Sequence, residues 1–97
     1  MKPADLLNEA AGLVSGERNK AYGDAYQQHV KAARMWSAYL QAKYGISPEL
    51  SASDVCHLMS LLKWSREMSG PFKADNNVDD CGYAALAGYC AWKEHEQ

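Results

Sequence analysis

Long hydrophobic runs are missing from this sequence. Nowhere do the roughly 18 consecutive apolar residues occur that a helix needs to cross a bilayer. The first residues, from Met1 to Asp5, also lack the apolar core of a secretion signal. We therefore expect a soluble protein with no membrane partner.

Cysteine is scarce, and its spacing excludes two common uses. Cys56, Cys81 and Cys90 form no Cys-x-x-Cys pair, whereas zinc ribbons and disulfide frameworks need paired spacings. We predict free, buried thiols, which suit a reducing compartment such as the cytosol.

Positive charge is not in surplus. Ten Lys and Arg residues stand against twelve Asp and Glu residues, and the formal net charge is −2. Proteins that bind duplex nucleic acid carry a basic surface to meet the phosphates. We therefore do not expect duplex nucleic acid as a partner, although the net charge does not exclude a local basic patch.

The composition that remains is that of one small globular domain. The 97 residues are 47% hydrophobic and 23% charged, with only three prolines, which suits a single domain over residues 1–97. Apolar residues recur at every third or fourth position almost throughout, the spacing of amphipathic helices. We predict an all-α fold, a small antiparallel bundle of about four helices, three long and one short and N-terminal.

Turn and capping residues predict the ends of the first helices. Pro3 suits the start of the short helix and Gly16 its end. Asp24 is expected to cap a helix over residues 25–44, and Gly45 to end it.

The later helices are bounded in the same way. A third helix is predicted from residues 51–53 to 69, and Asp75-Asn76-Asn77 predict the cap of a last helix over residues 78–94. Gly82 and Gly88 lie inside that last helix, where glycine costs about 1 kcal/mol relative to alanine. We expect a neighbouring helix or a ligand to approach closely there.

One polar cluster surrounds a glycine turn. Arg18 and Lys20 precede Tyr22-Gly23-Asp24, and a turn flanked by cations can hold a phosphate. The alternative is that Asp24 caps the next helix and the cations are solvated, since no Walker-type glycine spacing is present.

A second cluster contains two cations on the third predicted helix. Lys63 and Arg66 lie three residues apart beside Met59 and Leu62, so we expect both to be half-buried. A half-buried cation needs an anionic partner. That partner is either a protein carboxylate or a ligand phosphate.

The third cluster is acidic. Asp75 and Asp79 are four residues apart, and two carboxylates one turn apart can hold Mg²⁺, although acids also gather at helix N-termini because of the helix dipole. If the last two helices form an antiparallel hairpin, these acids face Lys63 and Arg66. The spacing predicts a mixed-charge junction and leaves its occupant open.

Aromatic and histidine residues add no local catalytic motif. Three tryptophans and six tyrosines are expected mostly in the core, with Trp64 left for self-association. His29, His57 and His95 form no i, i+4 pair, and no Cys/His dyad or serine elbow follows from local spacing.

Several motifs together resemble a family of small helical proteins of unknown function encoded by tailed phages and prophages. They are Tyr22-Gly23-Asp24, Leu61-Leu62-Lys63 with Arg66, and Asp-Asn-x-x-Asp-x-x-Gly-Tyr-Ala-Ala-Leu from Asp75 to Leu86. The resemblance covers Arg18 to Gly88 and implies the cytosol of a bacterial host. It implies functional residues at Tyr22, Gly23, Asp24, Lys63, Arg66, Asp75, Asn76, Asp79, Gly82 and Tyr83, whereas Asp80 stands where we expect an apolar residue.

A more distant likeness is to the all-α nucleoside triphosphate pyrophosphohydrolases of the MazG type. These bind magnesium through Glu-Glu-x-x-Glu on one helix and Glu-x-x-Asp on another. Asp75 and Asp79 can stand in for the second motif, but no Glu-Glu-x-x-Glu is present. Enzymatic activity therefore stays open.

Two functions remain as hypotheses. In the first, the junction binds a nucleotide or another phosphorylated molecule with Mg²⁺. Its cations meet the phosphates, Asp75 and Asp79 hold the metal, and a tyrosine stacks on a base; the ligand residues are Arg18, Tyr22, Asp24, Lys63, Arg66, Asn76 and Tyr83. In the second, the chain is a non-enzymatic interaction module that binds a host protein or forms a homo-oligomer through Trp64 and the last helix.

Overall fold

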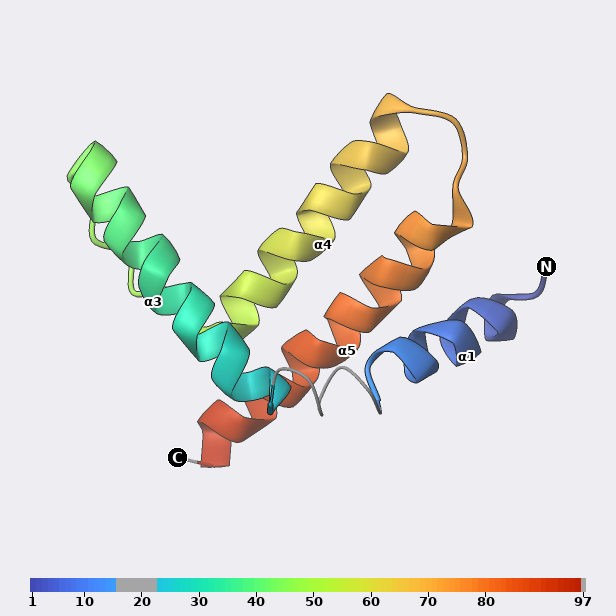
Figure 1. Cartoon of the computed structure of the whole chain (residues 1–97), viewed down its shortest axis with the longest axis horizontal. Coiled ribbons are helices and arrows are strands. Elements are labelled where there is room, and N and C mark those ends of the chain that lie inside the picture. The colour runs from blue at the N-terminus through green and yellow to red at the C-terminus, as the bar shows by residue number, and fades with distance from the viewer. Residues whose placement is uncertain (16–22, 97) are drawn as a thin grey trace.

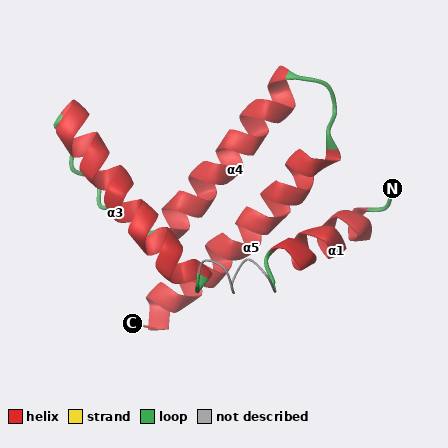
Figure 2. Ribbon diagram, viewed as in Figure 1, coloured by secondary structure: helices red, strands yellow, loops and turns green. Residues whose placement is uncertain are grey.

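The computed structural model describes residues 1–15 and 23–96, and every regular element in that part of the chain is a helix (Figures 1 and 2). The helices are α1 (Pro3–Leu13), α3 (Ala25–Tyr44), α4 (Ala52–Ser69) and α5 (Ala74–Glu96). The predicted all-α bundle, with one short N-terminal and three long helices, is confirmed.

Local chemistry sets the ends of α3 and α4. Asp24 accepts a hydrogen bond from the Gln27 amide at 3.4 Å, and Gly45 ends α3 in the left-handed conformation with φ of 71°. At the start of α4 the Ser51 hydroxyl and the Asp54 carboxylate each accept from the other residue's amide, at 3.1 and 2.8 Å. The predicted limits of these helices are confirmed.

Helix α5 begins earlier than predicted. It starts at Ala74, so Asp75-Asn76-Asn77 lie inside its first turn instead of ahead of it. The Asn76 amide donates to the Lys73 carbonyl at 3.1 Å, which closes that turn. The capping prediction was wrong because alanine extends the helix backwards and acidic residues are also favoured in a first turn. As a result, Asp79 lies in the second turn.

The helices are arranged around the α4–α5 hairpin (Figure 1). These two helices run antiparallel and share the most extensive contact, as predicted. Helix α1 packs against α5, while α3 contacts both α4 and α5 near its N-terminal end and then diverges from them. The three long helices therefore meet at one end of the molecule, and α3 alone diverges from the α4–α5 hairpin towards the other end.

The core lies at this meeting point and is built from small side chains. Its buried cluster consists of Tyr26, Ala52, Cys56, Ala87 and Cys90. Among the described residues, no Leu, Ile, Met, Phe or Trp is buried. The prediction that most aromatic area lies in the core was wrong, because the diverging helices do not enclose it; the large exposed aromatic residues are Tyr39, Tyr44, Trp64, Phe72 and Trp92.

The two helical glycines of α5 differ in their surroundings. A Cβ atom on buried Gly82 would lie 3.4 Å from Cγ1 of Val14, so the end of α1 approaches closely there, as predicted. Gly88 is exposed and a Cβ atom would meet nothing within 4 Å. The expectation of a close neighbour is therefore wrong at Gly88.

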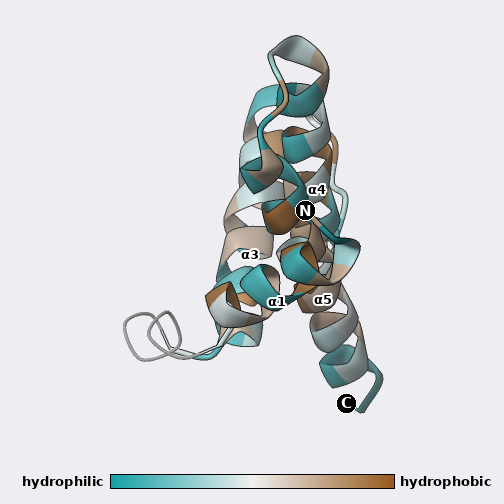
Figure 3. Cartoon of the chain, turned by 90° about the vertical axis from the view of Figure 1, so that its right-hand side faces the viewer, coloured by the Kyte–Doolittle hydropathy of each residue, from teal (hydrophilic) through white to brown (hydrophobic). Residues whose placement is uncertain are grey.

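Hydrophobic and hydrophilic residues are interspersed along the helices (Figure 3). Among the helices described, none carries an apolar stretch long enough to pass through a bilayer.

Candidate functional site

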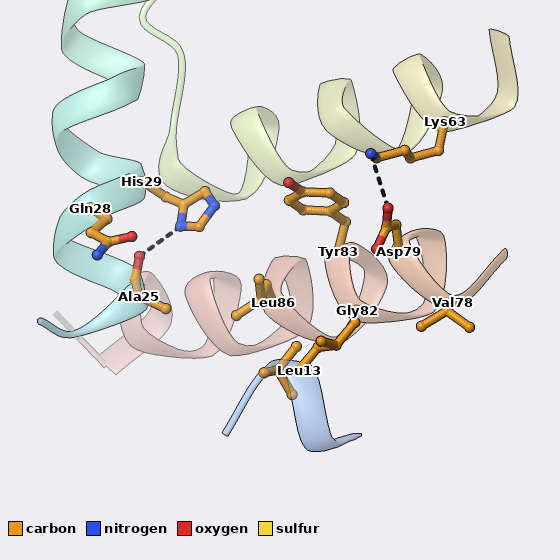
Figure 4. A pocket seen from close by; sticks show the side chains of 11 residues that line it. Leu13, Ala25, Gln28, His29, Lys63, Val78, Asp79, Gly82, Tyr83 and Leu86 are labelled. Atoms are coloured by element: carbon orange, nitrogen blue, oxygen red, sulfur yellow. Dashed lines mark hydrogen bonds and ion pairs between the residues drawn. The ribbon is translucent and has the colours of Figure 1, made fainter. Parts of the chain in front are cut away.

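A pocket opens where α3, α4 and α5 meet the end of α1 (Figure 4). Its volume is about 200 Å³. One part of its wall is polar and contains Gln28, His29, Lys63, Asp79 and Tyr83. The apolar part includes Leu13, Val14, Val78 and Leu86.

An ion pair in this wall links α4 to α5. The Lys63 Nζ atom lies 3.0 Å from an Asp79 carboxylate oxygen, and the two side chains are 13% and 35% exposed. Figure 4 shows both side chains at the same side of the pocket. The predicted mixed-charge junction therefore exists, and its two members neutralise each other in the free protein.

Arg66 and Asp75 do not join this pair. Both residues are exposed, and neither lines the pocket. The prediction that Arg66 is half-buried was wrong, because three helical positions after Lys63 its side chain lies about 60° away around α4, towards solvent. Asp75 lies one turn before Asp79, nearer the end of the hairpin, and Asn76 is half-buried but also outside the pocket.

Asp24 has a structural role, because its carboxylate connects two helices. One carboxylate oxygen caps α3, and the other accepts a hydrogen bond from the Tyr89 hydroxyl at 2.9 Å. This bond, together with burial and the negative charge of Asp24, raises the pKa of Tyr89. Asp24 thus joins the start of α3 to α5 and does not line the pocket. Arg18 and Tyr22 lie outside the described residues.

Asp80, the unexpected acid of the last motif, has a partner. Its carboxylate accepts a hydrogen bond from the Trp64 indole nitrogen at 2.7 Å. The bond explains a polar residue at a position where we expected an apolar one. Trp64 remains 48% exposed, so this contact holds the ring at the surface of the hairpin.

His29 and Gln28 are pocket residues that no pattern in the sequence indicated. They extend from α3, whereas Lys63 and Asp79 belong to α4 and α5. His29 donates from Nδ1 to the Ala25 carbonyl at 2.7 Å (Figure 4). Only the packing of three helices brings these side chains together, and no spacing within one segment records that packing.

The cysteines are free, and two of the three are buried. Burial is the main cause that raises the pKa of Cys56 to about 12, and the neighbouring Cys90 adds to it. Burial also raises the pKa of Cys90. The prediction of free buried thiols is confirmed for Cys56 and Cys90, while Cys81 is half-buried.

Comparisons with known proteins identify the family. A family described as "Domain of unknown function (DUF6378)" matches residues 5–91. The Gene 55 protein of Mycobacterium phage L5 is 37% identical over 81 residues, which are 84% of this chain and 49% of the phage protein. The Gene 55 protein of Mycobacterium phage D29 is 37% identical over 79 residues, which are 81% of this chain and 48% of that protein.

These matches confirm the resemblance to a phage-encoded family, and they do not extend it to the MazG-type enzymes. The chain spans about half the length of the curated relatives it matches. No solved structure matches it. From the family match over nearly its whole length, the chain belongs to the DUF6378 family of unknown function.

Proposed function

We propose that the pocket binds a phosphorylated small molecule together with a divalent cation. The observation that carries this proposal is the Lys63–Asp79 pair in the pocket wall. A carboxylate oxygen is a ligand that Mg²⁺ prefers, and an ammonium group binds phosphate oxygens. A magnesium–phosphate complex would therefore supply a new partner to each member of the pair.

This exchange keeps the charges compensated. Removing one partner from a partly buried pair leaves the other without compensation, which is costly. When Mg²⁺ takes Asp79 and a phosphate takes Lys63, neither ion is left alone. Phosphate binding should therefore depend on the cation, since phosphate by itself would have to compete with Asp79 for Lys63.

The size of the pocket limits how much of the ligand it holds. Pockets for drug-sized molecules measure roughly 300–1,000 Å³, and this one measures about 200 Å³. It suits the phosphate groups, while a nucleoside would extend from the opening. The Tyr83 ring lies between His29 and Lys63 in the view of Figure 4, where it offers an aromatic face to a base.

Binding is proposed here without hydrolysis. Magnesium sites of the MazG type use several carboxylates, whereas Asp79 is the only carboxylate among the described residues of this pocket. The chain's own residues support recognition of a metal–phosphate complex, and the resemblance to pyrophosphohydrolases stays a prediction.

Isothermal titration calorimetry tests the proposal. Pyrophosphate and a panel of nucleoside mono-, di- and triphosphates are titrated with and without Mg²⁺. We expect binding with the cation, and a loss of affinity of about 10- to 100-fold in Lys63→Met and Asp79→Asn, the size of a lost charge-assisted hydrogen bond. Arg66→Met is the matched control, because Arg66 is a cation of the same helix outside the pocket. The proposal fails if no ligand gives heat, or if Arg66→Met loses as much affinity as Lys63→Met.

A second candidate function, self-association, rests on a different observation. Helix α4 carries large apolar residues on both of its sides. Val55, Cys56 and Met59 lie on the side that packs within the chain, and the opposite side also carries large apolar residues. We call this side the outer face of α4; it consists of Leu58, Leu61, Leu62 and Met68, which are 40–83% exposed, and Trp64 lies at its edge, where it contacts Asp80 of α5. Large apolar residues that gather on an exposed face are typical of a surface that a partner covers.

The chain exposes more surface than a compact monomer of its mass, and the excess is large enough for a partner to cover. The chain exposes 6867 Å², about a quarter more than the ~5,500 Å² of a compact monomer of 10.7 kDa. Its radius of gyration is 14.7 Å, against about 12.5 Å for a compact domain of this length. The excess is larger than the ~800 Å² that each partner buries in a standard interface.

A second copy of this chain is the occupant we propose for the outer face. Two copies related by a two-fold axis would pair the same apolar face with itself, and a net charge of −2 per chain opposes this only weakly. Sedimentation equilibrium at several concentrations should give twice the mass of 10.7 kDa. A monomer at all concentrations would contradict self-association, and a monomer that binds another protein through this face would favour a host partner instead.

A further inference from the structure

We propose that His29, Cys56 and Cys90 form a binding site for a soft or borderline metal ion, of which Zn²⁺ is the representative. Each residue offers one ligand atom, and these three atoms lie within 4.8 Å of one another. The ligands come from α3, α4 and α5, so an ion bound here would join the three long helices. The site shares His29 with the wall of the pocket but does not include Asp79, to which the proposed function assigns the divalent cation.

The Nδ1 atom of His29 is engaged in a hydrogen bond, which leaves Nε2 as the ligand atom. A carbonyl oxygen can only accept, so the 2.7 Å contact with Ala25 places the ring proton on Nδ1. In the neutral ring this leaves the lone pair on Nε2, on the opposite side of the ring (Figure 4). Metal-binding histidines usually donate their other N–H to a carbonyl or carboxylate in this way.

The two thiols are soft ligands held in a dry environment. Cys56 and Cys90 are fully buried and form no disulfide. Thiolate and imidazole ligands together select ions such as Zn²⁺ over Mg²⁺ or Ca²⁺. In the metal-free protein these thiols keep their protons, since burial raises the pKa of both, and a bound ion would displace them.

The spacing of the ligand atoms requires only a small adjustment. At the usual Zn–S and Zn–N lengths, ligand atoms of a tetrahedral site lie about 3.5–3.8 Å apart, and the three atoms here lie within 4.8 Å of one another. Side-chain rotation suffices for a change of this size. Three protein ligands leave one further position, which water can fill.

The core around this cluster gives such an ion a structural use. The side chains buried beside Cys56 and Cys90 are Tyr26, Ala52 and Ala87, and Val30, Leu86 and Tyr89 pack against them while partly buried. Few large side chains are therefore fully enclosed where α3, α4 and α5 meet. Small domains with limited cores are often stabilised by a structural metal. A metal at this point would stabilise the meeting of the three helices.

Titration of the whole metal-free chain with Co²⁺, a coloured substitute for Zn²⁺, tests the proposal. We expect one equivalent of Co²⁺ to give thiolate-to-metal charge-transfer absorption in the near ultraviolet, which Zn²⁺ then removes. Cys90→Ser should abolish this absorption, and His29→Gln should weaken Co²⁺ binding by roughly tenfold or more. Cys81→Ser and His57→Gln are matched controls outside the cluster, and Asp79→Asn should bind Co²⁺ as the unaltered chain does.

The thermal midpoint provides a second measurement. Zn²⁺ should raise the thermal midpoint of the unaltered chain and of Cys81→Ser, but not that of His29→Gln. Because His29 is half-exposed, its substitution threatens the fold less than a substitution of the buried Cys90. The proposal is overturned if the unaltered chain shows no charge-transfer absorption. It is also overturned if His29→Gln binds Co²⁺ normally, or if Cys81→Ser removes the signal.

Discussion

Lys63 and Asp79 are buried to different extents, so replacing one or the other should lower the free energy of unfolding by different amounts. Lys63 is 13% exposed and Asp79 is 35% exposed, so an unpaired Asp79 is solvated more easily than an unpaired Lys63. We expect Asp79→Asn to lower the free energy of unfolding by about 1–3 kcal/mol, and Lys63→Met by about 1 kcal/mol or less. Urea denaturation measures both values, and a larger cost for Lys63→Met would contradict the assigned burial.

The two glycines of α5 allow a prediction about stability. Gly88→Ala should raise the free energy of unfolding by about 0.5–1 kcal/mol, because alanine favours the helix and the new methyl group meets nothing within 4 Å. Gly82→Ala should gain less, since its methyl group would press against Val14 at 3.4 Å. Thermal or urea unfolding of the two variants compares them. An equal gain at both positions would argue against the packing of α1 on α5.

Cys56 makes the stability of the fold depend on pH in the alkaline range. Its pKa is raised from 9.0 to about 12 in the fold, so above pH 9 the unfolded chain loses this proton more readily than the folded one. The contribution of the protonated Cys56 thiol to the free energy of unfolding is therefore complete below pH 9. It is lost as the pH rises from 9 towards 12. Urea denaturation of the metal-free protein at pH 8 to 11 should show this decline. The decline should be smaller in Cys56→Ala, and an equal decline would contradict the assignment to Cys56.

The outer face of α4 provides a prediction at the level of one element. Leu61→Glu places a charge on this face at a residue that is 52% exposed, so the monomer should keep its fold while the dimer dissociates. Leu7→Glu on α1 is the matched control, because Leu7 is also an exposed leucine, at 59%. Sedimentation velocity measures the shift. Self-association through α4 is contradicted if Leu61→Glu remains a dimer or if Leu7→Glu dissociates it equally.

The limits of α3 and α4 followed from the sequence because each end has a residue with one strong local preference. Asp24 and Ser51 accept amide hydrogen bonds at the starts, and Gly45 adopts the positive φ that ends α3. The start of α5 was predicted four residues late, because Asp75-Asn76-Asn77 suit a first turn as well as a cap. Elements can be placed from sequence where the local signal has a single interpretation.

The candidate site could be predicted only where one hairpin determines it. Lys63 and Asp79 lie on paired helices whose antiparallel arrangement brings them together. Arg66 and Asp75 were included because they lie three and four residues from Lys63 and Asp79 on the same helices, but their side chains are exposed outside the pocket. His29 was missed because its place depends on how α3 crosses α4 and α5, a contact between residues far apart in the sequence.

At the scale of the whole molecule, the chain is more open than a compact monomer of its size. Hydrophobic residues at helical spacing predicted an enclosed core, but they are found on both sides of α4 and the interior is filled mainly by small residues. Periodicity shows which residues share a face of a helix and does not show which molecule covers that face. A partner copy would give this pattern a physical reason.

The position of the bound phosphate tests the central claim most directly. Assigned ¹H–¹⁵N spectra of the chain are recorded during a titration with pyrophosphate in the presence of Mg²⁺. The proposal predicts that the largest shifts occur at the amides of Lys63, Asp79, Gly82 and Tyr83, around the pocket of Figure 4. A second, more open hollow beside Arg34 and Ser37 serves as the internal control. Shifts centred there, or no shifts at any described residue, would contradict the claim that the Lys63–Asp79 pair binds a metal–phosphate complex.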